Sequence, residues 1–144
     1  MSTQQSTVHE AQTLEQISKC FPVMKQLRPA YTHDAYTQRV TEQRSMGYRL
    51  AYIEVAGTVV AVAGFRITLC LSWGKFLYVD DLVTDEQQRS KHYGTQLLSW
   101  LKNEARRNGC SQFHLDSGVQ RADAHRFYLR EGMEKTCYHF AENL

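Results

Sequence analysis

The chain has 144 residues, the size of one typical domain, which leaves little room for a second independent core. Hydrophobic residues make up 42% and charged residues 22%, a composition that excludes a disordered chain. The net charge of +2 is too small to indicate the basic surface of a nucleic-acid-binding protein, and it gives no argument for a membrane surface. We therefore expect a single domain, residues 1–144, that binds neither nucleic acid nor membrane.

The four cysteines are far apart in the sequence: Cys20, Cys70, Cys110 and Cys137. None forms a C-x-x-C pair, which argues against a zinc site, so we expect no metal. A chain of this size can build its own core, which favours reduced, mostly buried thiols over disulfides. The N-terminus lacks the pattern of a secretory signal, and no apolar run approaches the ~18 residues of a membrane helix. These features predict a cytoplasmic protein.

The first third of the chain has the apolar spacing of helices. Apolar residues recur three and four positions apart: Leu14, Ile17, Phe21 and Met24. Pro22 interrupts this pattern and predicts a kink or a helix boundary. A second helix is expected from about residue 33 to 46, and residues 7–10 are compatible with an extra strand.

The character then changes to that of strands. Residues 48–55 and 58–67 are rich in β-forming residues, and Ala56-Gly57 between them indicates a hairpin. A third strand is predicted at residues 76–83. We expect these three strands to form an antiparallel meander.

The last third alternates helices with strands. After a polar loop at residues 84–90, a long helix is predicted from about Lys91 to the stop signal Asn108-Gly109. A short strand at 111–116, a helix at 121–131 and a final strand at 133–140 follow. The resulting order, α-α-β-β-β-α-β-α-β, predicts a mixed α/β fold on one sheet.

The junction before the long helix has the features of an anion site. A helix N-terminus offers unsatisfied N–H groups and partial positive charge, Gly94 permits close approach, and Arg89 and Lys91 add charge. A diphosphate fits there, although the two basic residues could also belong to a solvated loop. The glycine patterns of nucleotide-hydrolase loops and dinucleotide-binding folds are absent.

Two linked motifs carry a family resemblance. Arg89-x-x-His92-x-Gly94 followed by Leu97-Leu98 resembles the coenzyme A signature of the GNAT superfamily of N-acetyltransferases, [Q/R]-x-x-G-x-[G/A]. The segment from His114 to Gly118, with the later run from Ala124 to Met133, resembles the strand and the A-x-x-F-Y-x-x-x-G-[F/M] helix of that family. Together the motifs cover about residues 76–134.

The chain departs from the family pattern at one position. His92 stands where the family has its first glycine, so a ring lies at the mouth of the phosphate pocket. The His92 N–H can still donate there if its φ stays negative, as in the first turn of a helix.

The resemblance implies a single α/β domain whose mixed, mostly antiparallel sheet has flanking helices and a splayed central strand pair. It also implies that the start of the long helix binds the pyrophosphate of acetyl-CoA through Arg89, Ser90, Lys91, His92, Tyr93, Gly94 and Thr95. The main chain of Leu82, Val83 and Thr84 would pair with the pantetheine arm like an added strand. The strand at 111–116 would splay away and admit the thioester. The side chains of Leu82 and Val83 are expected to pack in the core.

The reaction needs a neutral amine, whereas a lysine-like amine has a pKa near 10.4, so a base or a proton path is required. The candidates are Asp80, Asp81 and Glu54. Asp80 and Asp81 would point to opposite faces of a regular strand, and we slightly favour Asp81 because it adjoins an expected bulge. Each carboxylate could instead be a solvated strand residue, and an ordered water could serve as the proton path.

The resemblance makes Tyr128 the general acid for the departing thiolate, whereas its alternative role is packing beside Phe127. A phenol with a pKa of about 10 stays protonated near neutral pH and can donate. Other candidates have no assigned role. His125 lies on a predicted helix and is expected to face solvent, whereas His114 and His139 lie on predicted strands without a recognisable partner. Three aromatic residues could line an acceptor pocket or simply the core: Tyr31, Tyr36 and Trp73.

The resemblance implies an N-acetyltransferase that moves the acetyl group of acetyl-CoA to a primary amine of a small molecule or peptide, by direct attack in a ternary complex. The alternative is a non-catalytic coenzyme A-binding regulatory module, which the histidine at position 92 suggests. The acidic residues hint at a cationic acceptor such as a polyamine, an aminoglycoside-like amine or a peptide lysine. The sequence identifies neither the acceptor nor the oligomeric state, although homodimers are common among similar proteins.

Overall fold

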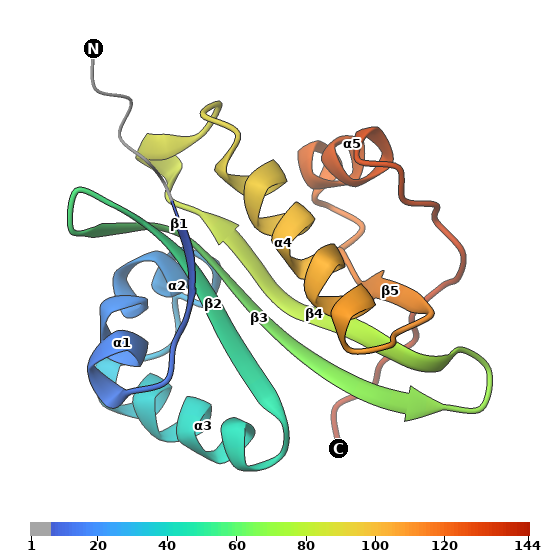
Figure 1. Ribbon diagram of the computed structural model, residues 1–144, viewed down its shortest axis with the longest axis horizontal. Coiled ribbons are helices and arrows are strands. Elements are labelled where there is room, and N and C mark those ends of the chain that lie inside the picture. The colour runs from blue at the N-terminus through green and yellow to red at the C-terminus, as the bar shows by residue number, and fades with distance from the viewer. Residues whose placement is uncertain (1–6) are drawn as a thin grey trace. The chain divides into compact units, whose positions relative to one another are not determined.

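The computed structural model describes residues 7–144. The chain divides into two compact parts, residues 7–114 and residues 115–144. A five-stranded sheet and four helices form the first part, and one helix belongs to the second (Figure 1).

The strands lie in the sheet in the same order as in the sequence. They are β1 (Thr7–Glu10), β2 (Tyr48–Val55), β3 (Thr58–Cys70), β4 (Gly74–Thr84) and β5 (Gln112–Leu115). Neighbours from β1 to β4 pair antiparallel, and the connection through a helix to β5 makes the sheet mixed. The predicted meander and the extra strand at residues 7–10 are therefore confirmed.

The helices are α1 (Leu14–Lys19), α2 (Phe21–Leu27), α3 (His33–Ser45), α4 (Tyr93–Arg107) and α5 (Ala122–Arg130), with a short 3₁₀ turn at Glu86–Gln88. Thr13 starts α1 with a capping box, and Thr32 caps α3. The predicted boundary near Pro22 is confirmed, because α1 ends at Cys20 and Pro22 lies in the first turn of α2.

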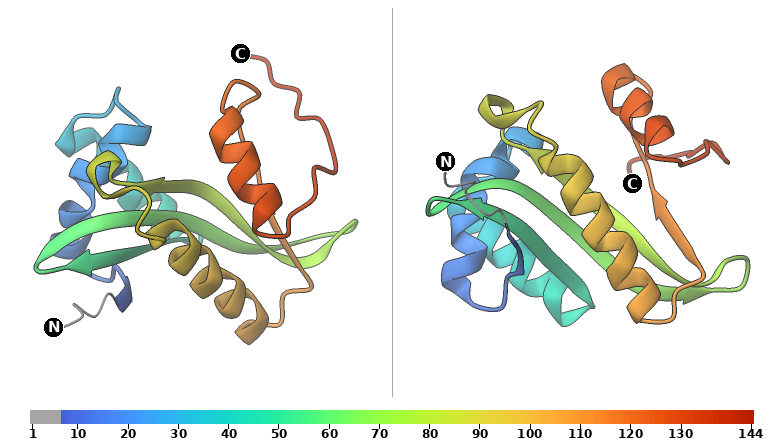
Figure 2. Two further views of the ribbon diagram at one scale, coloured as in Figure 1. Left: turned by 90° about the horizontal axis from the view of Figure 1, so that it is seen from above. Right: turned by 45° about the horizontal axis from the view of Figure 1, so that its top comes forward.

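Helices cover both faces of the sheet. Figure 2 shows α1, α2 and α3 on one side of β1–β4 and α4 on the other. The alternation of strand side chains explains this arrangement. Tyr48 and Leu50 join the core beneath α1–α3, whereas the intervening Arg49 pairs with Glu104 of α4. On the α4 side, the ring of Phe65 meets Trp100 with ring centroids 6.0 Å apart.

The second part departs from the sequence prediction. Helix α5 forms within the expected range, but residues 133–144 form no strand, so the strand predicted at 133–140 is wrong. Residues 134–144 are exposed and therefore bury no face. Without a buried face or a paired neighbour, alternating side chains do not stabilise a strand.

None of the helices between residues 7 and 144 is long and apolar enough to cross a membrane. The same residues contain no group of three or more His, Cys, Asp or Glu side chains that could hold a metal ion. All four cysteines are free thiols. Cys20 is buried, Cys70 and Cys110 are half-buried and Cys137 is exposed, so the expectation of mostly buried thiols is wrong.

Candidate active site

A β-bulge interrupts β4 at its two aspartates. Gly64 of β3 lies opposite Asp81, whereas the next residue, Phe65, lies opposite Val79. In the backbone register Asp80 is therefore an extra residue of β4, with no residue of β3 directly opposite it. The bulge occurs where the sequence analysis expects one, beside Asp81.

The bulge places both carboxylates on one face of the sheet. The carboxylate of Asp80 bonds Arg66 on β3, and that of Asp81 accepts a hydrogen bond from Tyr48 on β2. Tyr48 and Arg66 are cross-strand partners, so their side chains share a face. The opposite orientation expected for a regular strand does not occur, because the extra residue breaks the alternation.

Arginine side chains neutralise these two carboxylates. The guanidinium of Arg66 donates to both oxygens of Asp80 at 2.8 and 2.9 Å. Arg28, at the end of α2, donates to Oδ1 of Asp81 at 3.0 Å and to the carbonyl oxygen of Asp80 at 3.1 Å. Burial and the nearby Asp81 carboxylate raise the pKa of Tyr48 well above its usual value, so its hydroxyl remains a donor.

Asp81 lines a small pocket of about 150 Å³ beneath α2 and α3. Its other lining residues are Met24, Arg28, Tyr31, Tyr36, Arg39, Val40, Gln43 and Tyr48. Tyr31 and Tyr36 were both candidates for lining an acceptor pocket. Trp73 lies elsewhere, stacked on His114 with a centroid separation of 3.6 Å.

Glu54 lies apart from the two aspartates. Leu50 of β2 is opposite Gly64, which is opposite Asp81, and Glu54 is four residues farther along β2, roughly 13 Å. Its carboxylate forms an ion pair with Lys19 of α1. The structure therefore brings Asp80 and Asp81 together but leaves Glu54 outside the pocket.

The loop before α4 has an unusual backbone. Ser90 and His92 have φ values of 69° and 64°, in the left-handed region that non-glycine residues seldom occupy. The helix begins at Tyr93, and His92 is its N-cap, without a side-chain hydrogen bond to the first turn. The negative φ considered for His92 is therefore not adopted. Glycine adopts a positive φ without strain, so the conformation at position 92 suits the glycine of the motif that this segment resembles.

The residues assigned to the coenzyme extend from β4 into α4. Leu82, Val83 and Thr84 pair with β3 through residues 61–63 and are half-buried. The loop side chains of Arg89, Ser90, Lys91 and His92 are exposed, whereas Tyr93, Gly94 and Thr95 in the first turn of α4 are half-buried. Lys91 donates to the side chain of Gln88 at 2.8 Å.

β5 meets β4 near the first residues of β4. The Ser111 N–H donates to the Lys75 carbonyl oxygen at 2.8 Å, and the His114 ring contacts Trp73 and Phe76. Leu82 lies six residues beyond Phe76, or roughly 20 Å along β4. This spacing is compatible with a strand pair that separates toward the end of β4.

The second part contains Tyr128, in α5. Tyr128 is half-buried, and its ring lies 5.5 Å from that of Phe127, centroid to centroid. Burial raises its pKa, and the charge of Arg121 opposes this only in part. The hydroxyl therefore stays protonated at neutral pH. The other histidines have partners in this part: His125 bonds the Gly118 carbonyl oxygen at 2.7 Å, and His139 lies 3.3 Å from Asp116.

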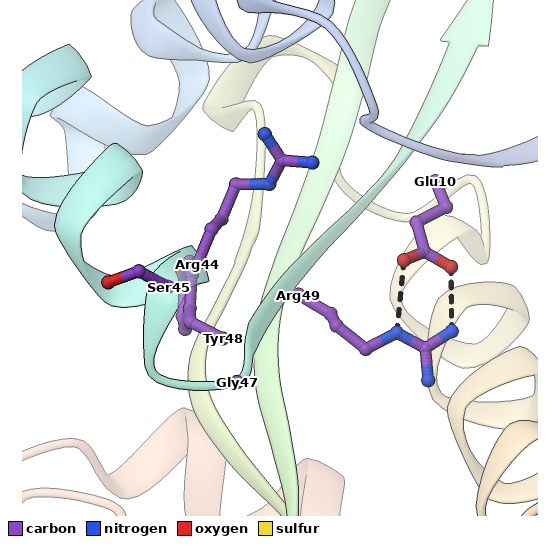
Figure 3. Close-up of a pocket in the computed structure, with 6 residues that line it drawn as sticks. All are labelled: Glu10, Arg44, Ser45, Gly47, Tyr48 and Arg49. Carbon is purple, nitrogen blue, oxygen red and sulfur yellow. Dashed lines mark hydrogen bonds and ion pairs between the residues drawn. The ribbon is translucent and has the colours of Figure 1, made fainter.

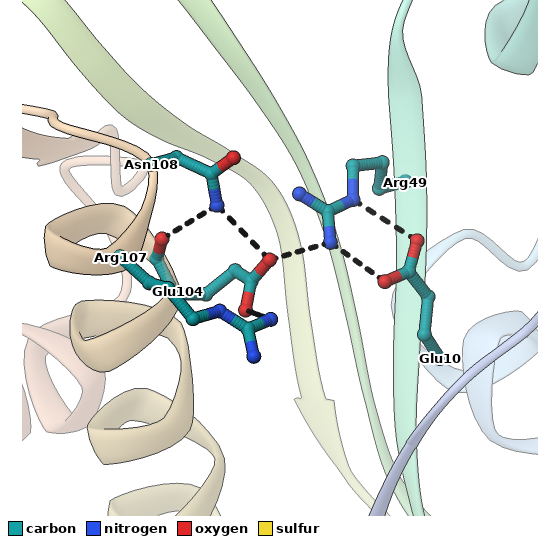
Figure 4. Close-up of polar contacts among 5 residues, drawn as sticks. All are labelled: Glu10, Arg49, Glu104, Arg107 and Asn108. Atoms are coloured by element: carbon teal, nitrogen blue, oxygen red, sulfur yellow. Dashed lines mark hydrogen bonds and ion pairs between the residues drawn. The ribbon is translucent and has the colours of Figure 1, made fainter.

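An ion-pair network fixes α4 to the sheet (Figure 4). Arg49 of β2 bonds Glu10 of β1 at 2.6 and 3.0 Å and Glu104 of α4 at 2.7 Å. Glu104 is only 5% exposed and also bonds Arg107 and Asn108. The sequence analysis missed these residues, although an arginine between apolar residues of a predicted strand is a signal for a buried ion pair.

A second hollow, of about 480 Å³, lies where β2 begins (Figure 3). Its lining residues are Glu10, Arg44, Ser45, Gly47, Tyr48 and Arg49. Glu10 already holds the guanidinium of Arg49, as the dashed lines in Figure 3 indicate. The hollow therefore has less free charge to offer a ligand than its two arginines suggest.

Comparisons with known proteins agree with this geometry. The sequence matches the acetyltransferase (GNAT) family over residues 11–133. An uncharacterized N-acetyltransferase, YhdJ of Bacillus subtilis (strain 168), is 34% identical over 115 residues, which are 79% of this chain and 81% of that protein. Aminoalkylphosphonate N-acetyltransferase of Salmonella typhimurium is 35% identical over 98 residues, 67% of this chain and 62% of that protein.

Solved structures show the same fold. An aminoglycoside N-acetyltransferase, AAC(6')-Iy in complex with CoA, superposes with a TM-score of 0.87 at 14% identity, covering 99% of this chain and 97% of the other. Glucosamine-6-phosphate N-acetyltransferase from Arabidopsis thaliana gives a TM-score of 0.78 at 22% identity, with 96% and 98% covered. With a family match over most of its length and two sequence relatives of the same class, the chain is a member of the acetyltransferase (GNAT) family and an N-acetyltransferase.

Proposed function

We propose that the protein transfers the acetyl group of acetyl-CoA to a primary amine by direct attack within a complex of both substrates. The observation that carries the proposal is the small pocket at the bulge, where the carboxylate of Asp81 lines the wall. Its volume of about 150 Å³ is below the ~300–1,000 Å³ typical of sites for drug-sized ligands. This favours a small-molecule amine over a peptide.

The start of α4 fits the pyrophosphate of acetyl-CoA. The first N–H groups of a helix have no partner within the helix, and the side chain of His92 does not cap them. These groups and the charges of Arg89 and Lys91 favour an anion. The main chain of Leu82, Val83 and Thr84 offers the edge along which the pantetheine arm would bind.

Bound acetyl-CoA supplies the acetyl group as a thioester. The amine nitrogen forms the new C–N bond, the C–S bond breaks, the thiolate takes one proton, and the amine loses one. Asp81 attracts and orients the amine. The proton that the amine loses is transferred to the carboxylate of Asp81 or to water. Asp80 holds the side chain of Arg66 in place through their ion pair. Glu54, which is paired with Lys19 outside the pocket, contributes only its negative charge to the local electrostatics. Tyr128 donates the proton to the thiolate.

The relatives support a small amine as acceptor. The Salmonella protein, which is similar over two thirds of this chain, is named for its action on an aminoalkylphosphonate. We further propose that residues 1–144 form one acetyltransferase domain that acts in the cytoplasm, and that it assembles as a homodimer.

The direct test is a thiol-release assay with acetyl-CoA and a panel of small amines, followed by mass spectrometry of the acetylated product. Asp81→Asn should lower kcat/KM about 100-fold with little change in the Kd of acetyl-CoA. Asp80→Asn should have a smaller effect, and Glu54→Gln the smallest. If no amine in a broad panel is acetylated while coenzyme A still binds, the regulatory-module alternative replaces this function.

A further inference from the structure

The pocket that contains Asp81 has an excess of positive charge. Its ionised lining residues are Asp81, Arg28 and Arg39. Arg28 is already paired with Asp81 at 3.0 Å, so these two charges offset one another. Arg39 is left as the uncompensated charge of the wall.

The side chain of Arg39 has no polar partner in the part of the chain that the structure describes. Among residues 7–144 its guanidinium forms no hydrogen bond and no ion pair, whereas the arginines at the bulge are both engaged. An arginine of this kind presents several donors in a fixed plane, a geometry that matches carboxylate and phosphonate groups.

Helix α3 directs Arg39 toward the pocket. Tyr36, Arg39, Val40 and Gln43 all line it, and they follow the spacing of one helix face. Tyr36 is fixed by a hydrogen bond of 2.8 Å from its hydroxyl to the Ile17 carbonyl oxygen. Val40 is buried in the core. The base of the arginine is therefore held by packed neighbours while its charged end remains available.

We propose that the acceptor is a small amine that also carries an anionic group, and that Arg39 is the residue that selects it. The amine would donate a hydrogen bond to the carboxylate of Asp81 and the anion would lie at Arg39, so a single molecule would use the acceptor oxygens of Asp81 and offset the charge of Arg39. This rests on the acetyltransferase function proposed above. Such an acceptor differs from the polyamine or peptide lysine that the acidic residues suggest, because Asp80, Asp81 and Glu54 are each paired with a cation.

The test compares four acceptors of similar length: propylamine, β-alanine, 2-aminoethylphosphonate and 1,3-diaminopropane. The wild-type protein should acetylate at least one of the two anionic amines with a kcat/KM about tenfold or more above that for propylamine. The difference between β-alanine and 2-aminoethylphosphonate then distinguishes a carboxylate from a phosphonate. The diamine should be the poorest acceptor.

Variants at position 39 then assign the preference. Arg39→Gln should abolish the preference for anionic amines, because it should lower kcat/KM for these amines much more than for propylamine. Arg39→Lys should retain part of it, since the charge remains but the planar fork does not. Arg39→Glu should reverse it in favour of 1,3-diaminopropane. Arg106→Gln is the matched control, because Arg106 is an exposed arginine of α4 whose side chain donates to Asn103, away from the pocket.

The two proposals fail in different ways. Equal or better acetylation of propylamine or the diamine by the wild-type protein would overturn the anionic acceptor and leave the acetyltransferase intact. A preference for anionic amines that survives in Arg39→Gln would also overturn the role of Arg39. If no amine is acetylated, calorimetry with 2-aminoethylphosphonate decides: binding that Arg39→Gln weakens about tenfold or more supports the anion site, and no binding or equal binding overturns it.

Discussion

The hydroxyl of Tyr48 donates a hydrogen bond of 2.7 Å to Oδ2 of Asp81, from β2 to β4 across the intervening strand. The residue between them on β3 is Gly64. A Cβ at this position would lie 1.7 Å from the Tyr48 hydroxyl oxygen and 2.7 Å from Oδ2 of Asp81. The absent side chain at position 64 is therefore what allows the tyrosine to reach the carboxylate.

Gly64→Ala should displace the Tyr48 ring and destabilise the protein by about 3 kcal/mol, because the buried strand cannot accommodate the added methyl group. Tyr48→Phe, which removes only the donor, should cost about 1 kcal/mol. Both should weaken acceptor turnover. Chemical denaturation measures the two losses, and a Gly64→Ala protein of normal stability would contradict the crowding at this position.

His92→Gly should stabilise the fold by about 1 kcal/mol, because glycine adopts the positive φ of this residue without strain. It should also tighten coenzyme A binding if the backbone at position 92 contacts phosphate. Ala56→Gly is the matched control, since Ala56 has a φ of 52° in the β2–β3 turn. The control should gain stability without a change in coenzyme affinity. If the wild type, His92→Gly and Ala56→Gly all bind coenzyme A with equal affinity, position 92 is not part of the binding site.

Gly94→Val should weaken the binding of acetyl-CoA about tenfold or more, because the side chain would enter the space assigned to the pyrophosphate. Ser99→Val, at an exposed position of α4, introduces the same β-branched residue away from the helix start. Calorimetry should find normal affinity in this control. A folded Gly94→Val protein with normal affinity would exclude the start of α4 as the coenzyme site.

Tyr128→Phe should lower kcat about 10²–10⁴-fold, because the variant keeps the ring but cannot donate a proton to the thiolate. Acetyl-CoA affinity and Tm should change little. The measurement requires conditions in which chemistry limits the rate, which a pre-steady-state experiment can establish. Normal kcat under those conditions would show that water, and not Tyr128, donates the proton to the thiolate.

The network at Glu104 should make stability depend on pH. Burial acts to raise the pKa of this carboxyl, but hydrogen bonds and charge from Arg49, Asn108 and Arg107 outweigh it and leave the pKa lowered. A lowered pKa in the folded state stabilises the protein above the unfolded pKa of about 4.3, and this contribution is lost as the pH falls further.

Glu104→Gln should therefore cost about 1–3 kcal/mol at pH 7, and the difference from wild type should shrink as the pH falls below about 4. Urea denaturation at a series of pH values measures both effects. Glu42→Gln, an exposed carboxylate on α3, should follow the wild-type curve at every pH. A Glu104→Gln deficit that is the same at pH 7 and pH 3 would show that the carboxylate charge contributes nothing.

The sequence predicts most of the fold because the signals are local. The hairpin at Ala56-Gly57, the interruption at Pro22 and the stop at Asn108-Gly109 depend on the backbone preferences of a few residues, and each predicts a boundary that the structure contains. The strand at 133–140 fails for the opposite reason. A strand needs a hydrogen-bonded neighbour, and a short run of residues does not reveal whether one exists.

The site is harder to predict than the fold because its interactions join distant residues. Asp80 and Asp81 are recognisable as candidates, but their partners Arg66 and Arg28 are 14 and 53 residues away. The shared face of the two carboxylates depends on a bulge whose register the sequence does not reveal. Arg39 has no sequence signal at all, because its role in the pocket follows from the packing of α3.

The extra residue in β4 also determines which face of the sheet each later side chain of that strand occupies. Deleting Asp80 would restore regular alternation, and every side chain on one side of the deletion would turn to the opposite face relative to the other side. Substitution can adjust this site one side chain at a time, whereas a deletion would exchange its inner and outer surfaces together. This segment of β4 should therefore tolerate substitutions more readily than insertions or deletions.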